Sequence, residues 1–333
     1  MHPIDISAAR FTRLLVTGVA MLLAVATSVA AQPSSAKAAE GGPPSERLVV
    51  FGTSLSDPGN AFALVGGTNT PPDYLTDASI VPTAPYTRGG HHFTDGPTWI
   101  EQLARTLKAN INAEPAFKGS NPRAMNFAVG AARARETGVN ANLPFQVATF
   151  LQAKGGVASP DALYVIEVGT NDVRDALNAG PGGPAIIAAA IAFIRANVDL
   201  LYAAGARRFL IWNVPNPALT PVIRSLNNPA VSLVALSLAN SFNTALAGQV
   251  AQLNATRPGI DIEVLDVFAL LNTVVANYPA FGFTNVSTPC ITPSEAPYFC
   301  QHPDEYLFWD GVHPTAAMHG IVAAFAEMRL SQP

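Results

Sequence analysis

Short apolar runs alternate along the chain with longer segments in which apolar residues recur at every third or fourth position. The run at residues 49–52 ends in small and turn-forming residues, which predicts a buried strand that leads into a tight loop. The same pattern predicts strands at residues 124–132, 162–168, 208–214 and 260–267, and helices at residues 97–107, 143–153, 184–204, 230–253 and 316–330. Strands that alternate with helices predict a parallel sheet covered on both faces. We therefore expect a single three-layer α/β/α domain.

The composition is that of a folded globular protein. Only 13% of the 333 residues are charged and 49% are hydrophobic, which excludes a disordered chain. The length suits one large α/β domain with a substantial core. The net charge is −4 and no basic cluster is present, so the sequence lacks the electrostatic pattern of a nucleic-acid-binding protein.

The N-terminus has the pattern of a secretory signal peptide. Two arginines precede an apolar run at residues 14–31, which ends in small residues typical of a cleavage site after Ala31. The alternative is an uncleaved membrane anchor, although the run is barely long enough to span a bilayer. The expected division is a signal peptide over residues 1–31, a flexible lead-in over residues 32–46 and the folded domain over residues 47–333. We expect a soluble secreted protein, either periplasmic or extracellular.

The expected export of the protein determines how its two cysteines are interpreted. An even number of cysteines in an oxidising compartment predicts a disulfide between Cys290 and Cys300, with two free thiols as the alternative. Closing a loop of about ten residues contributes roughly 2–3 kcal/mol in the chain-entropy model. We expect no metal site here, because His302 is the only further ligand type nearby, nor at the adjacent His91 and His92 in a Gly-rich loop.

Candidate catalytic groups follow three of the predicted strands. Ser54 follows the first strand, Gly130 and Ala131 follow the second, and Asn171 follows the third. The carboxyl ends of parallel strands lie at one edge of a sheet, where open α/β folds bind their ligands. Each group alone is compatible with an ordinary turn. Together they predict a shared site at that edge.

A fourth group lies late in the chain, where Asp310 precedes His313 by three residues in a turn before a helix. This spacing lets the carboxylate bond one imidazole nitrogen while the other nitrogen faces Ser54. A nucleophile, a base and an orienting acid in one chain of hydrogen bonds are the requirements of a serine hydrolase. A histidine that merely caps the final helix is the alternative.

These blocks resemble the GDSL lipase/esterase family of the SGNH hydrolase superfamily, in particular its larger secreted branch of lipases and phospholipases. The resemblance rests on residues 51–60, 126–131, 169–172 and 310–315, and extends to residues 94–99 and to Cys300 ahead of residues 308–310. It implies the SGNH hydrolase fold with a parallel, flavodoxin-like sheet. It also implies hydrolysis of carboxylic esters without a metal or an organic cofactor.

Carried over residue by residue, the resemblance implies three catalytic roles. Ser54 is the implied nucleophile, His313 the general base and acid, and Asp310 the residue that orients the histidine. The tetrahedral intermediate of such a reaction needs a separate set of hydrogen-bond donors.

The implied oxyanion hole uses the backbone N–H of Ser54 and the side-chain amide of Asn171. Its third donor is a backbone N–H, either that of Ala131 or that of Gly130. The chain departs from the family here, since the family's oxyanion glycine aligns with Ala131, and an alanine at positive φ costs energy. A second departure is Thr53, where the family carries an aspartate.

We expect an enzyme that cleaves acyl or lipid esters through an acyl-enzyme on Ser54. Two alternatives stay open: an acetyl esterase that acts on polysaccharide, and a weakened ligand-binding member of the fold, motivated by Thr53 and Ala131. The expected partner is a small-molecule or lipid ester, with no nucleic acid and no membrane span after signal cleavage. The natural substrate and the oligomeric state stay open.

Overall fold

The structure is a computed structural model that describes residues 47–64, 91–291 and 300–332. The predicted signal peptide and lead-in lie outside the described residues. The same is true of residues 65–90, which belong to a stretch rich in Gly, Pro and Thr at residues 61–94. The described chain begins one residue before the first strand, and its fold follows from there.

Four parallel strands form the central sheet in the order β1-β2-β3-β4. The strands are β1 (Leu48–Gly52), β2 (Leu163–Glu167), β3 (Arg208–Trp212) and β4 (Asp261–Leu265). All residues of β1 and β2 are buried, with alternate side chains entering the two halves of the core. This double burial explains why both strands read as unbroken apolar runs.

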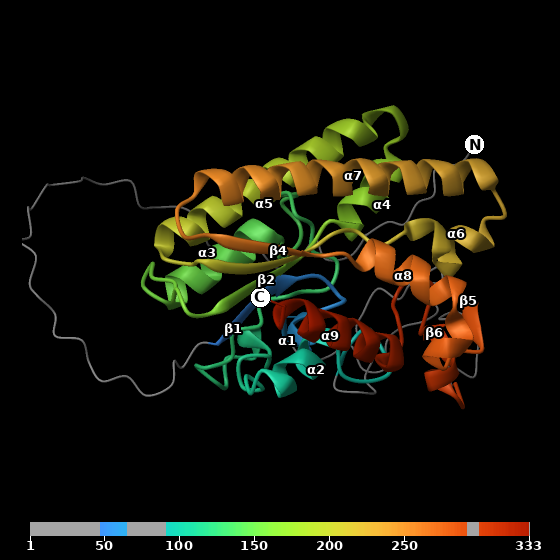
Figure 1. Cartoon of the computed structure of the whole chain (residues 1–333), viewed down its shortest axis with the longest axis horizontal. Coiled ribbons are helices and arrows are strands. Elements are labelled where there is room, and N and C mark those ends of the chain that lie inside the picture. Colours follow the sequence, from blue (N-terminus) through green and yellow to red (C-terminus); the bar gives the residue numbers. More distant parts are fainter. Residues whose placement is uncertain (1–46, 65–90, 292–299, 333) are drawn as a thin grey trace, which may run out of the picture.

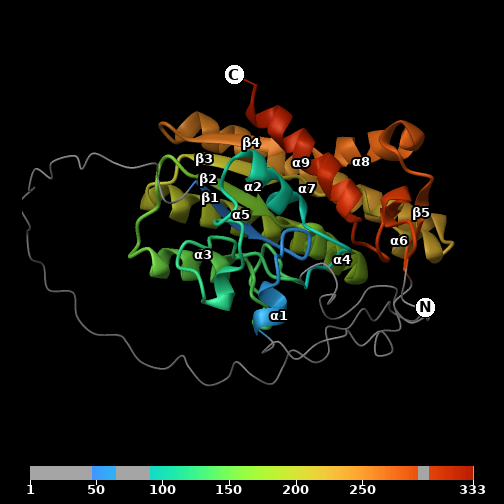
Figure 2. The ribbon, with the colours of Figure 1, turned by 90° about the horizontal axis from the view of Figure 1, so that it is seen from below.

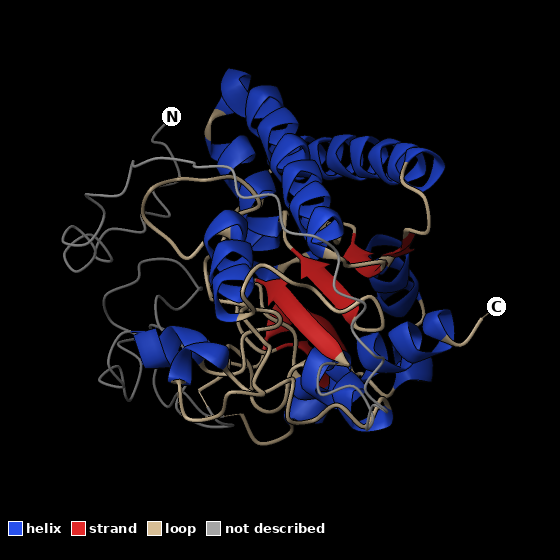
Figure 3. Cartoon of the chain, turned by 90° about the vertical axis from the view of Figure 1, so that its left-hand side faces the viewer, coloured by secondary structure: helices blue, strands red, loops and turns tan. Residues whose placement is uncertain are grey.

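Helices cover both faces of the sheet, as Figures 1 and 3 show. The first face carries α3 (Leu143–Ala153), α4 (Thr170–Asn178), α5 (Gly183–Ala204) and α7 (Pro229–Thr256). The second carries α2 (Trp99–Thr106), α8 (Val267–Ala276) and α9 (Ala316–Leu330). Helices α2 and α9 lie side by side (Figure 2), where Gln102 donates to the Ala316 carbonyl at 3.0 Å. The predicted three-layer α/β/α fold is confirmed.

The remaining elements are short. They are α1 (Asn60–Leu64), α6 (Pro221–Ser225), the small parallel pair β5 (Asn285–Pro289) and β6 (Tyr306–Phe308), and 3₁₀ turns at Ala116–Lys118, Gly180–Gly182, Pro217–Leu219, Tyr278–Phe281 and Pro303–Glu305. The β5–β6 pair is set apart from the central sheet and leads into the loop before α9.

The prediction of a strand at residues 124–132 is wrong. The segment makes only isolated bridges at Asn126, although the Val50 N–H and carbonyl bond the Met125 carbonyl and the Phe127 N–H at 2.9 and 2.8 Å. Its outer edge is closed by a side chain, since the Asn60 amide donates to the carbonyls of Asn126 and Ala128. Counted as a position in the sheet, the segment gives the chain order 2-1-3-4-5, which is that of flavodoxin.

Helices α4 and α8 are not among the elements predicted from the sequence. The residues after β2 resemble a turn in sequence, whereas α4 begins there at Thr170. The predicted helices at residues 143–153 and 316–330 are confirmed with the same bounds, and the other three are confirmed with shifted ends.

Residues 180–204 and α7 are long and apolar enough to cross a membrane by length and composition alone. In the structure each helix lays a row of side chains against the sheet, among them Ile187 and Ile194 from α5 and Phe242 and Leu246 from α7. One side of each helix is therefore part of the α/β core.

Candidate active site

The three side chains predicted to act in catalysis meet at the carboxyl edge of the sheet. Ser54 lies two residues beyond β1, and Asp310 and His313 lie in the loop between β6 and α9. The Ser54 Oγ is 2.9 Å from His313 Nε2, and His313 Nδ1 is 2.7 Å from Asp310 Oδ2. With the proton on Nδ1, the imidazole donates to the carboxylate and accepts the serine hydroxyl. Two distant parts of the chain thus form one hydrogen-bonded line.

Burial increases along this line from the serine to the acid. Ser54 is half-buried, His313 is 5% exposed and Asp310 is fully buried. The second carboxylate oxygen of Asp310 accepts the N–H groups of Val312 and His313 at 2.9 and 2.7 Å. These bonds give a buried carboxylate the partners that it needs and fix its orientation toward the imidazole.

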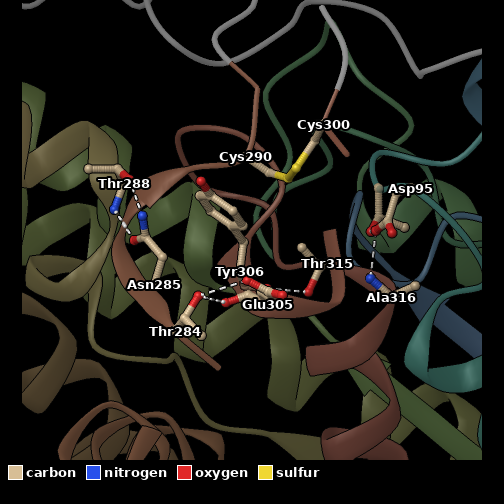
Figure 4. The surroundings of a disulfide bond; sticks show 11 residues. Asp95, Thr284, Asn285, Thr288, Cys290, Cys300, Glu305, Tyr306, Thr315 and Ala316 are labelled. Carbon is tan, nitrogen blue, oxygen red and sulfur yellow. Dashed lines mark hydrogen bonds between the residues drawn. A yellow bond between two sulfur atoms is a disulfide. The ribbon is translucent and has the colours of Figure 1, made fainter. Parts of the chain in front are cut away.

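The loop that carries Asp310 and His313 is held by two other parts of the chain. The Val222 N–H of α6 donates to the Gly311 carbonyl at 2.9 Å, and the Thr94 hydroxyl donates to the Pro314 carbonyl at 2.8 Å. Beside it, the Asp95 carboxylate accepts the Ala316 N–H at the start of α9 (Figure 4). The geometry of the acid and base is therefore set by contacts from across the fold.

The predicted disulfide joins Cys290 to Cys300, with the two Cα atoms 5.6 Å apart (Figure 4). The Cys290 N–H bonds the Phe308 carbonyl and the Ile291 N–H bonds the Trp309 carbonyl, both at 2.9 Å. Cys290 and Ile291 thus lie along the residues that immediately precede Asp310. They brace the loop that carries Asp310 and His313.

Asp57 ties the serine loop to the segment that follows residue 124. Its carboxylate accepts four backbone N–H groups, from Gly59, Asn60, Ala61 and Gly130, at 2.5–3.1 Å. Burial raises the pKa of Asp57 to about 6, while these four hydrogen bonds favour the ionised form. The Gly130 N–H is consequently engaged by Asp57.

Ala131 is left as the backbone donor of this segment. No hydrogen bond among the described residues uses the N–H of Ala131 or that of Ser54. Ala131 has a φ of +64°, a left-handed conformation that costs an L-residue roughly 1–2 kcal/mol. Gly130 has no room for a side chain, because a Cβ there would lie 2.4 Å from the Phe93 ring, which also contacts the His313 ring.

Asn171 reaches the same edge from the first turn of α4. The helix starts abruptly because Gly169 has a φ of +117°, and a Cβ at that position would lie 2.3 Å from Phe242. The Asn171 amide donates one N–H to the Ala132 carbonyl at 2.8 Å. Since a primary amide carries two N–H groups, the second is available to another acceptor.

Thr53 has a carboxylate partner on the neighbouring strand. The Glu167 carboxylate accepts the Thr53 N–H at 2.9 Å and the Thr53 hydroxyl at 2.9 and 3.0 Å. Glu167 is 1% exposed, and its burial raises its pKa from 4.5 to about 7, against hydrogen bonds from Thr53 and Ser56. The residue before the predicted nucleophile is thus fixed by Glu167.

We expect the free energy of unfolding to fall as the pH rises from about 4.5 through about 7. The raised pKa means that folded Glu167 binds its proton more tightly than unfolded Glu167, so the stabilisation is complete below pH 4.5 and is lost as the folded group ionises. At about 1.4 kcal/mol per pKa unit, the loss from this group is about 3 kcal/mol. The pKa values of Asp57 and Asp172, both raised by burial to about 6, add to the same slope.

Urea unfolding of the parent and of Glu167→Gln at pH 4.5, 6 and 8 measures this effect. We expect a clearly flatter pH dependence in Glu167→Gln, and the parent slope in Glu114→Gln, which changes an exposed carboxylate. Equal slopes in the parent and Glu167→Gln contradict the expectation.

The sequence analysis did not single out Asp57 or Glu167. Asp57 could have been recognised as a carboxylate within a loop of small residues, and Glu167 as a carboxylate within an apolar strand. In the described part of the chain, no three His, Cys, Asp or Glu side chains are grouped to hold a metal ion. The Nε2 of His92, one of the adjacent histidines, instead lies 3.0 Å from the Glu101 carboxylate.

The chain is similar in sequence to known GDSL esterase/lipases. The chain is 28% identical to a GDSL esterase/lipase of Arabidopsis thaliana, over 84% of this chain and 81% of the relative. It is 26% identical to the thermolabile hemolysin of Vibrio parahaemolyticus, over 83% of this chain and 62% of the relative. The family model described as GDSL-like lipase/acylhydrolase matches residues 48–325, nearly the whole described chain. The protein therefore belongs to the GDSL-like lipase/acylhydrolase family of ester hydrolases.

Proposed function

We propose that the protein is a secreted serine hydrolase that cleaves carboxylic esters of acyl or lipid substrates through an acyl-enzyme on Ser54. The observation that carries the proposal is the continuous line of hydrogen bonds from the Ser54 hydroxyl through His313 to the buried Asp310. Membership of the family supports the reaction class.

In the proposed reaction, His313 Nε2 takes the Ser54 proton as Oγ attacks the ester carbonyl carbon. The tetrahedral intermediate collapses when the protonated histidine gives its proton to the leaving alcohol, which departs and leaves Ser54 acylated. The same histidine then removes a proton from water as the water attacks the acyl-enzyme, and gives that proton to Ser54 Oγ when the acid is released. Asp310 keeps the imidazole in the required tautomer and stabilises its charged form.

The proposed oxyanion hole consists of the N–H groups of Ser54 and Ala131 and the second N–H of the Asn171 amide. Gly130 is left out of this set because its N–H donates to Asp57 at 2.8 Å. The Asn171 amide is already oriented by the Ala132 carbonyl, so it needs no reorganisation when charge develops on the substrate oxygen.

A panel of p-nitrophenyl esters from acetate to palmitate, run beside acetylated glycans, tests the proposal. We expect turnover of the p-nitrophenyl esters and labelling of Ser54 by a fluorophosphonate. Release of acetate from the glycans alone favours the polysaccharide acetyl esterase. No turnover and no label on Ser54 contradict the proposed enzyme and favour a ligand-binding protein.

We expect Asn171→Ala to lower kcat by roughly 10²-fold, because removing one oxyanion donor typically costs 10²–10³ in rate. The fluorophosphonate label on Ser54 should stay detectable, since Ser54, His313 and Asp310 are intact. Steady-state kinetics with the best ester of the panel measures the loss. Asn240→Ala, a change on the exposed face of α7, is the matched control, and an equal kcat in both variants contradicts the role.

Secretion is part of the proposal. It rests on the signal-peptide pattern of residues 1–31 and on the Cys290–Cys300 disulfide, a bond that persists in oxidising compartments. N-terminal sequencing of the exported protein tests it, with Gln32 expected as the first residue. A retained first segment on a membrane-bound product supports the anchor instead.

A further inference from the structure

Ala131 holds a conformation that its side chain disfavours. Its φ of +64° lies in the region that glycine adopts freely and other residues avoid. No helix or strand of the described chain includes Ala131, so no regular hydrogen-bond ladder enforces this backbone. The Ala132 N–H donates to the Val129 carbonyl at 3.1 Å and closes a four-residue turn, in which Ala131 takes the third position, where a type II turn has a positive φ. Contacts from outside the turn add to this bond.

The structure holds the chain on both sides of Ala131. On the N-terminal side, the Gly130 N–H donates to Asp57 at 2.8 Å. On the C-terminal side, the Ala131 carbonyl accepts a guanidinium N–H of Arg133 at 2.5 Å. Arg133 thus holds the Ala131–Ala132 peptide directly, whereas Asp57 holds the Val129–Gly130 peptide, one peptide before Ala131. A rotation of the backbone that turns the Ala131 carbonyl away has to break its bond to Arg133.

Arg133 is itself fixed in place. Its Nε and its second terminal nitrogen make a two-point contact with the Asp175 carboxylate of α4, both bonds at 3.0 Å. Its backbone N–H donates to the Asn142 side chain at 2.9 Å, and its carbonyl accepts the Leu143 N–H at 3.0 Å. The side chain is 7% exposed. A buried arginine whose guanidinium makes two hydrogen bonds to one carboxylate is a rigid donor, because the planar group can no longer rotate.

A further arginine completes the cluster. Arg135 pairs with Asp175 and lies 3.3 Å from Asp172, whose other oxygen accepts the Ala134 N–H at 2.8 Å. Asp172 and Asp175 stand on the same helix as Asn171, one residue and four residues after it. The helix that carries one proposed oxyanion donor therefore also anchors the residue that holds the other.

We propose that Arg133 is a positioning residue that holds Ala131 in its left-handed conformation and so aims the Ala131 N–H at the oxyanion, with Asp175 fixing Arg133. This inference rests on the proposed function. In this proposal, the contact with Arg133 compensates for the energy that the left-handed conformation costs an alanine at the oxyanion position. The arginine acts through the backbone and touches neither the substrate nor the reacting atoms.

The test is a double-mutant cycle between Arg133→Met and Ala131→Gly. With a short-chain p-nitrophenyl ester, we expect Arg133→Met to lower kcat by roughly 10–100-fold, a part of the value of one oxyanion donor, and to change KM by less than about threefold. Glycine adopts the left-handed conformation without the arginine. In the Ala131→Gly background, the same change should therefore cost at least about fivefold less in kcat.

The cycle separates positioning from a general effect of the lost charge. A direct electrostatic effect of the guanidinium predicts the same kcat loss in both backgrounds, and that result overturns the proposal. Arg133→Lys keeps the positive charge but loses the planar guanidinium group with its several N–H donors. We therefore expect its kcat to be close to that of Arg133→Met. Full activity in the lysine variant also overturns the proposal.

Arg257→Met is the matched control, because Arg257 makes a similar pair with Asp199 at 2.9 Å away from the site. We expect its kcat within about twofold of the parent, and a loss as large as that of Arg133→Met overturns the proposal. If Arg133→Met does not fold, Asp175→Asn replaces it in the cycle, with a smaller loss that Ala131→Gly again reduces. If the parent neither turns over esters nor is labelled at Ser54, both the proposed function and this inference are refuted. If the parent is active but the effects of Arg133→Met and Ala131→Gly on kcat are additive, only this inference is refuted.

Discussion

Replacing Ser54 by alanine should lower kcat by roughly 10⁵-fold and leave the fold intact. The change removes the only atom proposed to form a bond with the substrate, and losses of this size follow removal of the nucleophile in serine hydrolases. Ser54 is half-buried and its hydroxyl bonds His313, so its loss leaves no cavity in the core. We expect the thermal midpoint to stay within about 2 °C of the parent.

The measurement is steady-state kinetics with the best ester of the panel, together with fluorophosphonate labelling and a thermal melt. Ser241→Ala is the matched control, because its hydroxyl bonds only a carbonyl of its own helix, and its activity should equal that of the parent. Turnover by Ser54→Ala above about one per cent of the parent is incompatible with an acyl-enzyme on Ser54.

The second large effect is expected for Asp310→Asn, with a loss of roughly 10⁴-fold in kcat. The carboxylate accepts the His313 Nδ1–H on one oxygen and two backbone N–H groups on the other. An asparagine that keeps the backbone bonds turns its NH₂ group toward Nδ1. The imidazole then has to accept there and carry its proton on Nε2, so it presents a donor to Ser54 and cannot take the serine proton.

Because asparagine has nearly the shape of aspartate, the variant should fold, and kinetics and a thermal melt together show whether the loss is one of chemistry. Asp304→Asn, in an exposed turn of the same segment, is the control that should keep full activity. Activity of Asp310→Asn within tenfold of the parent contradicts the proposed role of the carboxylate.

Most of the fold was predictable because most helices and strands have a recognisable hydrophobic pattern within their own residues. The helices at residues 143–153 and 316–330 bury apolar residues at helical spacing, such as Leu143, Val147 and Phe150 in the first of them. Strands β2 and β3 are apolar apart from one charged residue at one end of each. Helix α4 escaped because its first turn is polar and follows a glycine, a pattern shared with turns. Residues 124–132 read as a strand because they pack like one. Their outer backbone groups are bonded by the side chains of Asn60 and Asn126 and by the Ala116 N–H in place of a further strand.

The departure at Thr53 shows where local information ends. From the sequence alone, the threonine in place of the family's aspartate leaves the rigidity of the serine loop open. The structure instead gives Thr53 two bonds to Glu167, more than a hundred positions later on the adjacent strand. An aspartate at 53 beside Glu167 places two carboxylates in one buried site, which like-charge repulsion disfavours.

The sequence by itself determined the alternation of the four sheet strands with helices, the family, and the serine, histidine and aspartate that the proposal places in catalysis, because hydrophobic period and motif spacing are properties of neighbouring residues. Only the tertiary structure decided that the Gly130 N–H is occupied by Asp57, that Ala131 is left-handed, and that Arg133 holds its carbonyl. These facts depend on which groups from separate elements come within hydrogen-bonding distance. A buried donor takes the partner that the packing brings to it, and packing is a property of the whole fold.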